Sequence, residues 1–173
     1  SNAVTILDDP RTINLGSGWT VVGISRQPID PSSSSIFGDV AVGSIWGWDG
    51  TKYVVATSVE VLHAYCVPTT EPASVQYDCL PLSDPSPDLS HTWNMFAVAE
   101  ETPVPLSYPN VVGSVWGWDG TKYVREELAL QPDKGYWVAA EAPAAGQQQN
   151  PMKFIRPLSD ELLSLEIRFE LSG

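Results

Sequence analysis

The sequence predicts an all-β protein of two tandem homologous small units, each a sandwich or barrel built from hairpins, with a C-terminal closing strand. Three observations predict it: a twelve-residue block that occurs twice, an Asp-Gly turn inside each copy of the block, and short apolar runs rich in β-branched residues. Such runs favour strands over helices. Many short strands dispose of their edges most readily in a sandwich or a barrel.

The duplicated block is the most specific signal in the chain. Residues 43–54 recur as residues 113–124, and the two copies differ only by Ile45 against Val115. A match of this length cannot arise by chance, so it indicates an internal repeat. Weaker matches continue on both sides of the block: 15–24 with 89–98, and 64–67 with 135–138.

The repeat sets the expected boundaries of the units, which are residues 4–80 and residues 81–160. Residues 1–3 are typical of the remnant of a cleaved expression tag and are left out of the fold. The end of the chain, 161–173, contains a perfect alternation of apolar and charged residues over 165–171. This pattern predicts a half-buried strand, which either closes the sheet or begins a third unit.

Each copy of the block predicts a β-hairpin. Asp49-Gly50 and Asp119-Gly120 supply the positive φ angles of a tight turn, with a loop of two or four residues. In either register the aromatic residues share one face, opposite Ile45 and Val54 in the first copy. The aromatic set is Trp46, Trp48 and Tyr53 in the first copy and Trp116, Trp118 and Tyr123 in the second.

These six aromatic residues are the candidate site. If at least two of the tryptophans were exposed and coplanar, they would form a platform on which sugar rings stack. In the alternative, they face inward, because small units need large side chains to build a core. The near-identity of the hairpins then fits a pseudo-symmetric interface in which each copy packs its aromatic face against the other.

The remaining elements follow from local composition. We expect a third strand around Tyr65 and Tyr136, packed differently in the first unit because Ala64 and Cys66 stand where the second unit has Gly and Trp. Residues 132–135 predict a turn before the second of these strands, and a different turn is expected in the first unit. One helical turn is expected within 35–40 after a serine cap. Proline-rich stretches predict connections outside central strands: 68–72, 81–87 and 103–109.

Composition excludes several classes of protein. The 173 residues carry 9 Lys and Arg against 21 Asp and Glu, a net charge of −12. This balance argues against a nucleic-acid partner, because phosphate binding needs clustered basic residues. No apolar run approaches the roughly 20 residues of a membrane helix, so no membrane insertion is expected. The hydrophobic content of 43% is that of a folded chain.

Candidate chemistry is sparse. Cys66 and Cys79 either form a disulfide, which persists only in an oxidising compartment, or are two unpaired apolar residues. Two cysteines and two separated histidines, His63 and His91, make no metal framework, and we expect neither metal nor cofactor. The sequence contains no nucleophile elbow, phosphate loop or dinucleotide fingerprint, so a hydrolase is a remote alternative and no catalytic residue is expected.

The order of motifs resembles a repeat of secreted and cell-surface multidomain proteins of bacteria. Its pattern is Gly-Trp-Asn, then Trp-x-aromatic-Asp-Gly, then Gly-Tyr-Trp-Val, and the second unit fits it through Trp93-Asn94, residues 116–120 and residues 135–138. The resemblance implies an extracellular bacterial setting and a non-catalytic accessory role, and it supplies no catalytic residues.

The predicted function is therefore that of a non-catalytic extracellular repeat module, which binds a partner or spaces other domains. The expected partners are a polysaccharide or another surface protein. A carbohydrate-binding module that uses exposed tryptophans is the first alternative. The C-terminal strand 165–171 offers a route to an oligomer by adding to the sheet edge of a neighbour. A secretion signal would lie outside this sequence.

Overall fold

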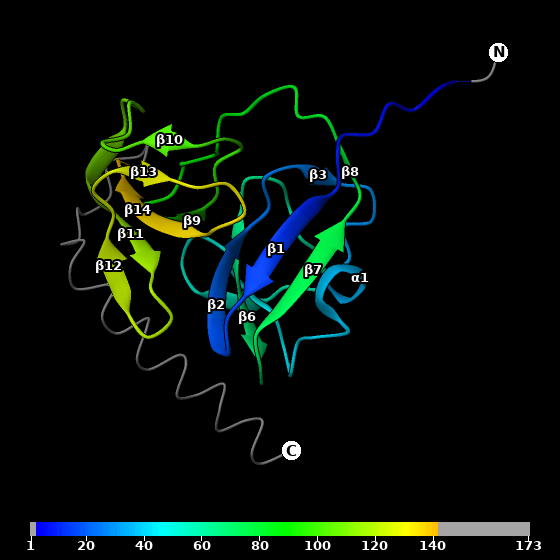
Figure 1. Ribbon diagram of the computed structural model, residues 1–173. Helices are drawn as coiled ribbons and strands as arrows, with labels where there is room; N and C mark the ends of the chain where they lie inside the picture. The colour runs from blue at the N-terminus through cyan, green and yellow to red at the C-terminus, as the bar shows by residue number, and fades with distance from the viewer. Residues whose placement is uncertain (1–2, 142–173) are drawn as a thin grey trace.

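The computed structural model describes residues 3–141, and strands dominate it (Figure 1). This confirms the predicted all-β class. Two four-stranded antiparallel sheets form its centre. In spatial order the first contains β2 (Gly18–Gly23), β6 (Ala64–Thr69), β4 (Trp46–Trp48) and β5 (Tyr53–Val55). The second contains β9 (Trp93–Phe96), β14 (Tyr136–Ala140), β11 (Val111–Trp118) and β12 (Tyr123–Arg125).

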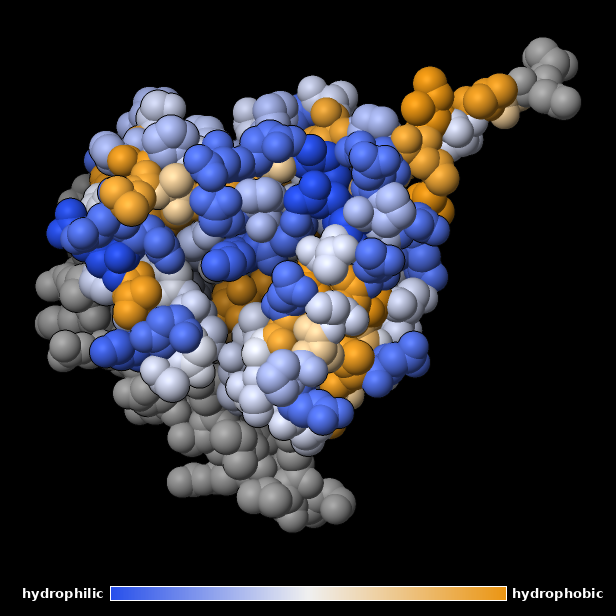
Figure 2. Space-filling view, viewed as in Figure 1, coloured by the Kyte–Doolittle hydropathy of each residue, from blue (hydrophilic) through white to orange (hydrophobic). Residues whose placement is uncertain are grey.

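Smaller elements surround these sheets, mostly in the first half of the chain. Three two-stranded pairs are β1 (Arg11–Leu15) with β7 (Ala73–Tyr77), β3 (Gln27–Pro28) with β8 (Cys79–Leu80), and β10 (Thr102–Pro103) with β13 (Ala129–Leu130). The helix α1 (Ser33–Phe37) begins two residues before the predicted turn and buries Ile36 and Phe37. Before β1 the chain projects from the body with apolar side chains exposed (Figure 2): Val4, Ile6 and Leu7.

The two central sheets have equivalent strand orders. Each strand of the first sheet occupies the place that its repeat-related strand has in the second, so β2, β6, β4 and β5 correspond to β9, β14, β11 and β12. The boundaries at 4–80 and 81–160 stay a prediction. The end of the second unit, the closing strand or third unit at 161–173, and the oligomer route through it lie outside the described residues.

The hairpins have the four-residue loop of the two predicted alternatives. Trp48 pairs with Tyr53, and Trp118 pairs with Tyr123. In the first turn the Asp49 carboxylate accepts hydrogen bonds from the backbone N–H of residues 51 and 52, both at 2.8 Å. Asp119 makes the same two bonds at the same distances. The repeated Asp-Gly therefore encodes one turn twice.

These turns predict a component of acid sensitivity. The hydrogen bond from the Thr51 N–H, followed by that from Lys52, lowers the pKa of Asp49 below its ordinary 3.8, and the matching bonds lower the pKa of Asp119. A lowered carboxylate pKa adds stability that is complete above the unfolded pKa and is lost as pH falls through the folded pKa. We expect acidification from pH 4 to pH 2 to lower the melting temperature of the Asp49→Asn/Asp119→Asn double variant by less than it lowers that of wild type.

The control for this prediction is Asp39→Asn, since that exposed carboxylate accepts no hydrogen bond from the described residues. Melting temperatures followed by circular dichroism at several pH values would make the comparison. If acidification lowers the melting temperatures of the double variant and of wild type by the same amount, the two turns contribute nothing to acid sensitivity.

The third strand of the first unit, β6, takes the same place in its sheet as β14. Its pairing differs, because β6 pairs with β4 only at Trp46 and Cys66, whereas β14 pairs with β11 at four positions. The expectation of a different turn before β6 is wrong, because Leu62 and Asp133 adopt positive φ angles of 62° and 67° at equivalent points. In both turns the carbonyl of the left-handed residue accepts a hydrogen bond from the other half of the chain.

Pro68 is also an exception to the predicted connections, because it lies inside the central strand β6. β4 pairs with β6 only at Trp46 and Cys66, so β6 has no ladder partner on that side near Pro68. The Pro68 carbonyl accepts a bond from the Val42 N–H on that side, outside the ladder. The missing N–H of proline therefore removes no hydrogen bond of the sheet.

Three hydrophobic clusters cover the faces of the sheets. One lies under the first sheet around Ile13, Phe37 and Val67, and one under the second around Leu130 and Val138. The third, here called the shared aromatic core, lies between the two halves. It contains buried Val21, Ala64, Cys66, Trp93, Met95, Trp137 and Ala139, with Trp19, Trp46, Trp48, Tyr53, Val112, Trp116, Trp118 and Tyr123 packed against them.

Candidate functional site

All six predicted site residues belong to the shared aromatic core. Trp137 lies at its centre, with ring-centroid distances of 5.0 Å to Trp48, 5.9 Å to Tyr53, 6.3 Å to Trp93 and 6.5 Å to Tyr123. Each of these contacts is edge-to-face, with interplanar angles from 74° to 90°. Edge-to-face contacts of this kind stabilise a core beyond the area they bury.

Two reciprocal hydrogen bonds cross between the halves. The indole N–H of Trp48 donates to the carbonyl of Trp93 at 2.9 Å, and that of Trp118 donates to the carbonyl of Trp19 at 2.9 Å. Trp19 and Trp93 are themselves repeat-related. Each aromatic hairpin is therefore anchored to the opposite half by the same bond, as the pseudo-symmetric alternative predicts.

The six rings do not form an exposed platform. None of the seven tryptophans of the chain is exposed, and the Tyr53 and Tyr123 side chains are also partly buried. Within each hairpin the rings stand edge-on, at 77° for Trp48 with Tyr53 and 67° for Trp118 with Tyr123. The coplanar surface that sugar stacking requires is absent, because these rings fill the space between two sheets.

The predicted disulfide is also absent, because both cysteines are free and buried. Cys66 lies in the shared aromatic core, whereas Cys79 lies in the cluster under the opposite face of the first sheet. Burial raises the pKa of the Cys66 thiol to about 12 and also raises the pKa of Cys79. The second predicted alternative, two unpaired apolar residues, describes both thiols.

Turns from each half also cover the sheet edge of the other. The carbonyl of Leu62 accepts a hydrogen bond from the Ala97 N–H at 2.9 Å, and the carbonyl of Asp133 accepts one from the Gly23 N–H at 3.2 Å. The Gly23 N–H lies at the end of β2 and the Ala97 N–H directly follows β9, and both strands are edge strands of their sheets. Asp133 additionally binds Arg11 and Ser25 of the first half.

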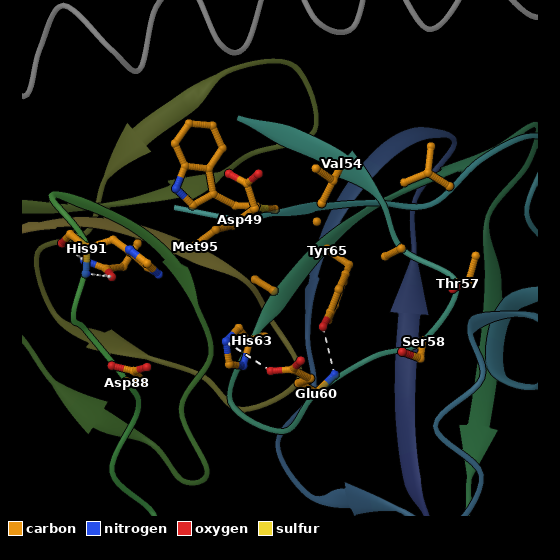
Figure 3. Close-up of a pocket in the computed structure, with 16 residues that line it drawn as sticks. Asp49, Val54, Thr57, Ser58, Glu60, His63, Tyr65, Asp88, His91 and Met95 are labelled. Carbon is orange, nitrogen blue, oxygen red and sulfur yellow. Dashed lines mark hydrogen bonds and ion pairs between the residues drawn. The ribbon is translucent and has the colours of Figure 1, made fainter. Parts of the chain in front are cut away.

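A groove of about 470 Å³ opens beside the aromatic core, between the two halves (Figure 3). The first half contributes most of its wall, and the second half contributes one side. The lining side chains that carry polar atoms are Trp48, Asp49, Thr57, Ser58, Glu60, His63, Tyr65, Asp88, His91 and Asn94. No lysine or arginine lines it.

Hydrogen bonds hold much of the groove wall in place. The Tyr65 hydroxyl accepts a bond from the Glu60 N–H at 2.8 Å, and burial raises the Tyr65 pKa to about 12. The Asn94 side chain donates to the His91 carbonyl at 2.7 Å and accepts from the His91 N–H at 3.1 Å. The His63 ring contacts the Val61 carbonyl and lies 3.6 Å from the Glu60 carboxylate.

The repeat produces a second, smaller cleft of about 180 Å³ at the equivalent place. Its lining includes Trp118 and Tyr136, which correspond to Trp48 and Tyr65 of the groove. One difference between the two linings is that Glu126 stands where the groove has Ala56. The N–H groups of these two residues donate equivalent hydrogen bonds to the carbonyls of Val115 and Ile45. The Glu126 carboxylate lies directly over Gly117, whereas the nearest atoms over Gly47 in the groove belong to the Tyr65 ring and to the Ala56 Cβ.

The sequence-based prediction missed the groove. Its free polar groups, Asp88 and His91, lie in a segment with no recognisable motif. The one sequence signal of the groove was a difference between the two copies immediately after the duplicated block, where Ala56 is aligned with Glu126. Burial raises the pKa of the Glu126 carboxyl, as expected for a side chain that fills a cleft.

The surroundings of the two histidines bear on the hydrolase alternative. Within residues 3–141 neither His63 nor His91 makes a hydrogen bond to a serine, threonine or cysteine side chain. The same residues contain no group of three or more His, Cys, Asp or Glu side chains placed to hold a metal ion. No helix among them has the length and apolar character to cross a bilayer.

Comparison of the chain with known protein families, curated proteins and solved structures finds no match.

Proposed function

We propose that this chain is a non-catalytic module of an extracellular bacterial protein and acts as a rigid spacer. The observation that carries the proposal is the reciprocal anchoring of the two aromatic hairpins, each by an indole N–H to the other half of the chain. The aromatic residues that the sequence marks most strongly are used for internal packing. A protein whose two halves share one core resists extension by its ends better than two independently folded units joined by a linker.

Two further features support this role. The turns at Leu62 and Asp133 exchange backbone hydrogen bonds between the halves, so that the edge strands β2 and β9 are covered from within the chain. Covered edges reduce unwanted pairing with neighbouring chains. The net charge of −12 favours solubility, and the extracellular bacterial setting comes from the resemblance of the repeat.

Pulling the chain by its two ends in optical tweezers tests the proposal. We expect a single rupture that releases the contour length of the whole described body, at about 3.5 Å per residue. The Trp48→Phe/Trp118→Phe variant keeps the apolar rings but loses both anchoring bonds, and it should rupture at lower force. Two separate ruptures of half that length in wild type would contradict the proposal, because the halves would then bear load independently.

A further inference from the structure

We propose that the groove between the halves binds a neutral sugar unit, of mono- to disaccharide size, through hydrogen bonds to Asp88, His91 and Asp49. This inference goes beyond the spacer role and does not depend on it. It also differs from the stacking platform considered above, because the contacts come from the polar wall of a cavity rather than from the faces of coplanar rings.

The size of the groove suits a small organic ligand. Ligand cavities in proteins commonly have volumes of about 300–1,000 Å³, and they combine apolar walls with a few placed polar groups. The groove, at about 470 Å³, falls within this range, whereas the equivalent cleft, at about 180 Å³, does not. Trp48, Tyr65 and Met95 contribute apolar atoms to its wall.

Charge narrows the class of ligand. Three carboxylates line the groove, those of Asp49, Glu60 and Asp88, and no lysine or arginine accompanies them. A phosphate, a sulfated sugar or a uronic acid would meet uncompensated negative charge there. A purely apolar ligand would remove these carboxylates from water without replacing their hydrogen bonds. A polyhydroxylated neutral ligand avoids both costs.

The groove wall offers hydrogen-bond donors and acceptors that suit the hydroxyl groups of a sugar. The side chains of Asp88 and His91 make no hydrogen bond or ion pair with another described residue, and they lie on the same side of the groove (Figure 3). The turn bonds of Asp49 use only its Oδ1 atom, which leaves Oδ2 available. Carboxylate oxygens accept from sugar hydroxyls, and an imidazole offers one donor and one acceptor.

The groove is also held in shape before any ligand arrives. His91 is fixed at its backbone by both atoms of the Asn94 amide, and its ring packs against Gly50 of the first hairpin, where a Cβ would approach the imidazole Nδ1 to 2.5 Å. The hydrogen bond that the Glu60 N–H donates to the Tyr65 hydroxyl fixes the opposite side of the groove. A preorganised wall loses little conformational entropy on binding.

Titration of the full chain with cellobiose, maltose, lactose and N,N′-diacetylchitobiose tests the inference, with the Trp48 indole N–H followed by NMR. We expect at least one of these sugars to shift that signal and to leave the Trp118 indole unshifted. Asp88→Asn and His91→Ala alter exposed side chains, so they should keep the fold. Each should weaken binding by about tenfold, the loss expected from the removal of one hydrogen bond.

A matched pair of variants uses the second cleft as the control. Ala56→Glu introduces the side chain that fills the equivalent cleft and should abolish the Trp48 shift, whereas Glu126→Ala should leave binding in the groove unchanged. Spermidine and inorganic phosphate complete the set of probes. The inference is overturned if no sugar shifts the Trp48 signal, if only spermidine or phosphate does, or if the Asp88 and His91 variants bind as well as wild type.

Discussion

Replacement of Trp137 by alanine is expected to lower the free energy of unfolding by about 3–5 kcal/mol, the cost of removing a large buried aromatic side chain. Trp137 is 1% exposed, and its ring contacts four other aromatic rings from both halves of the chain. The cavity left behind would lie at the junction of the two sheets. Domains commonly have only about 5–15 kcal/mol of stability, so this loss is a large part of the total.

The control for Trp137 is its repeat-related position, Cys66. Cys66→Ala removes a single buried sulfur atom from the same cluster, and we expect it to cost only about 1 kcal/mol. Urea unfolding followed by far-ultraviolet circular dichroism measures both variants without relying on the indole signal. Equal shifts in the two midpoints would contradict a central role for Trp137, and a loss below 1 kcal/mol for Trp137→Ala would do the same.

Replacement of Gly23 by alanine is expected to destabilise the protein by about 2–3 kcal/mol through overpacking. A Cβ at Gly23 would lie 2.5 Å from the Cβ of Ala97, its own repeat-related residue, and would also collide with the Lys134 carbonyl. Gly135 is related in the same way to Ala64, whose Cβ would be 2.6 Å from a Cβ at Gly135. At both of these contacts between repeat-related residues, there is room for only one methyl group.

The matched control is Gly16→Ala, because a Cβ there would have its nearest neighbour at 3.7 Å, an ordinary contact. Its stability should equal or slightly exceed that of wild type. Adding Ala97→Gly to the Gly23→Ala variant should restore part of the loss, since it removes the methyl collision but leaves the Lys134 carbonyl in place. If Gly23→Ala unfolds at the same urea concentration as Gly16→Ala, the close approach is not a constraint.

The differences between the two copies have a physical explanation once the halves are placed. At three positions near their junction a small residue of one copy corresponds to a larger one of the other: Gly23 with Ala97, Gly135 with Ala64, and Cys66 with Trp137. The mismatch at Cys66 suggested a differently packed strand. Its cause is instead that the shared aromatic core has space for a single central indole.

Local sequence determined the strands of the two central sheets, the hairpin turns and the faces of the hairpins, but not the short strands that surround those sheets. The Asp-Gly turns depend on hydrogen bonds within four residues, and the separation of Trp48 from Val54 depends only on the two-residue period of a strand. The alternation also placed Ile45 in a different cluster from Trp46. Interactions of such short range leave a direct trace in the order of residues.

Only the tertiary structure decided what the aromatic faces cover and where a cavity remains. An inward face and an exposed platform have the same pattern in the sequence, because the pattern records which residues share a side and not what lies opposite. The groove depends on Asp88 and His91 meeting Asp49 across the two halves, and on the absence of a side chain beyond Cβ at Ala56. Contacts between residues so distant in the chain are set by the packing of whole sheets, and no local preference encodes them.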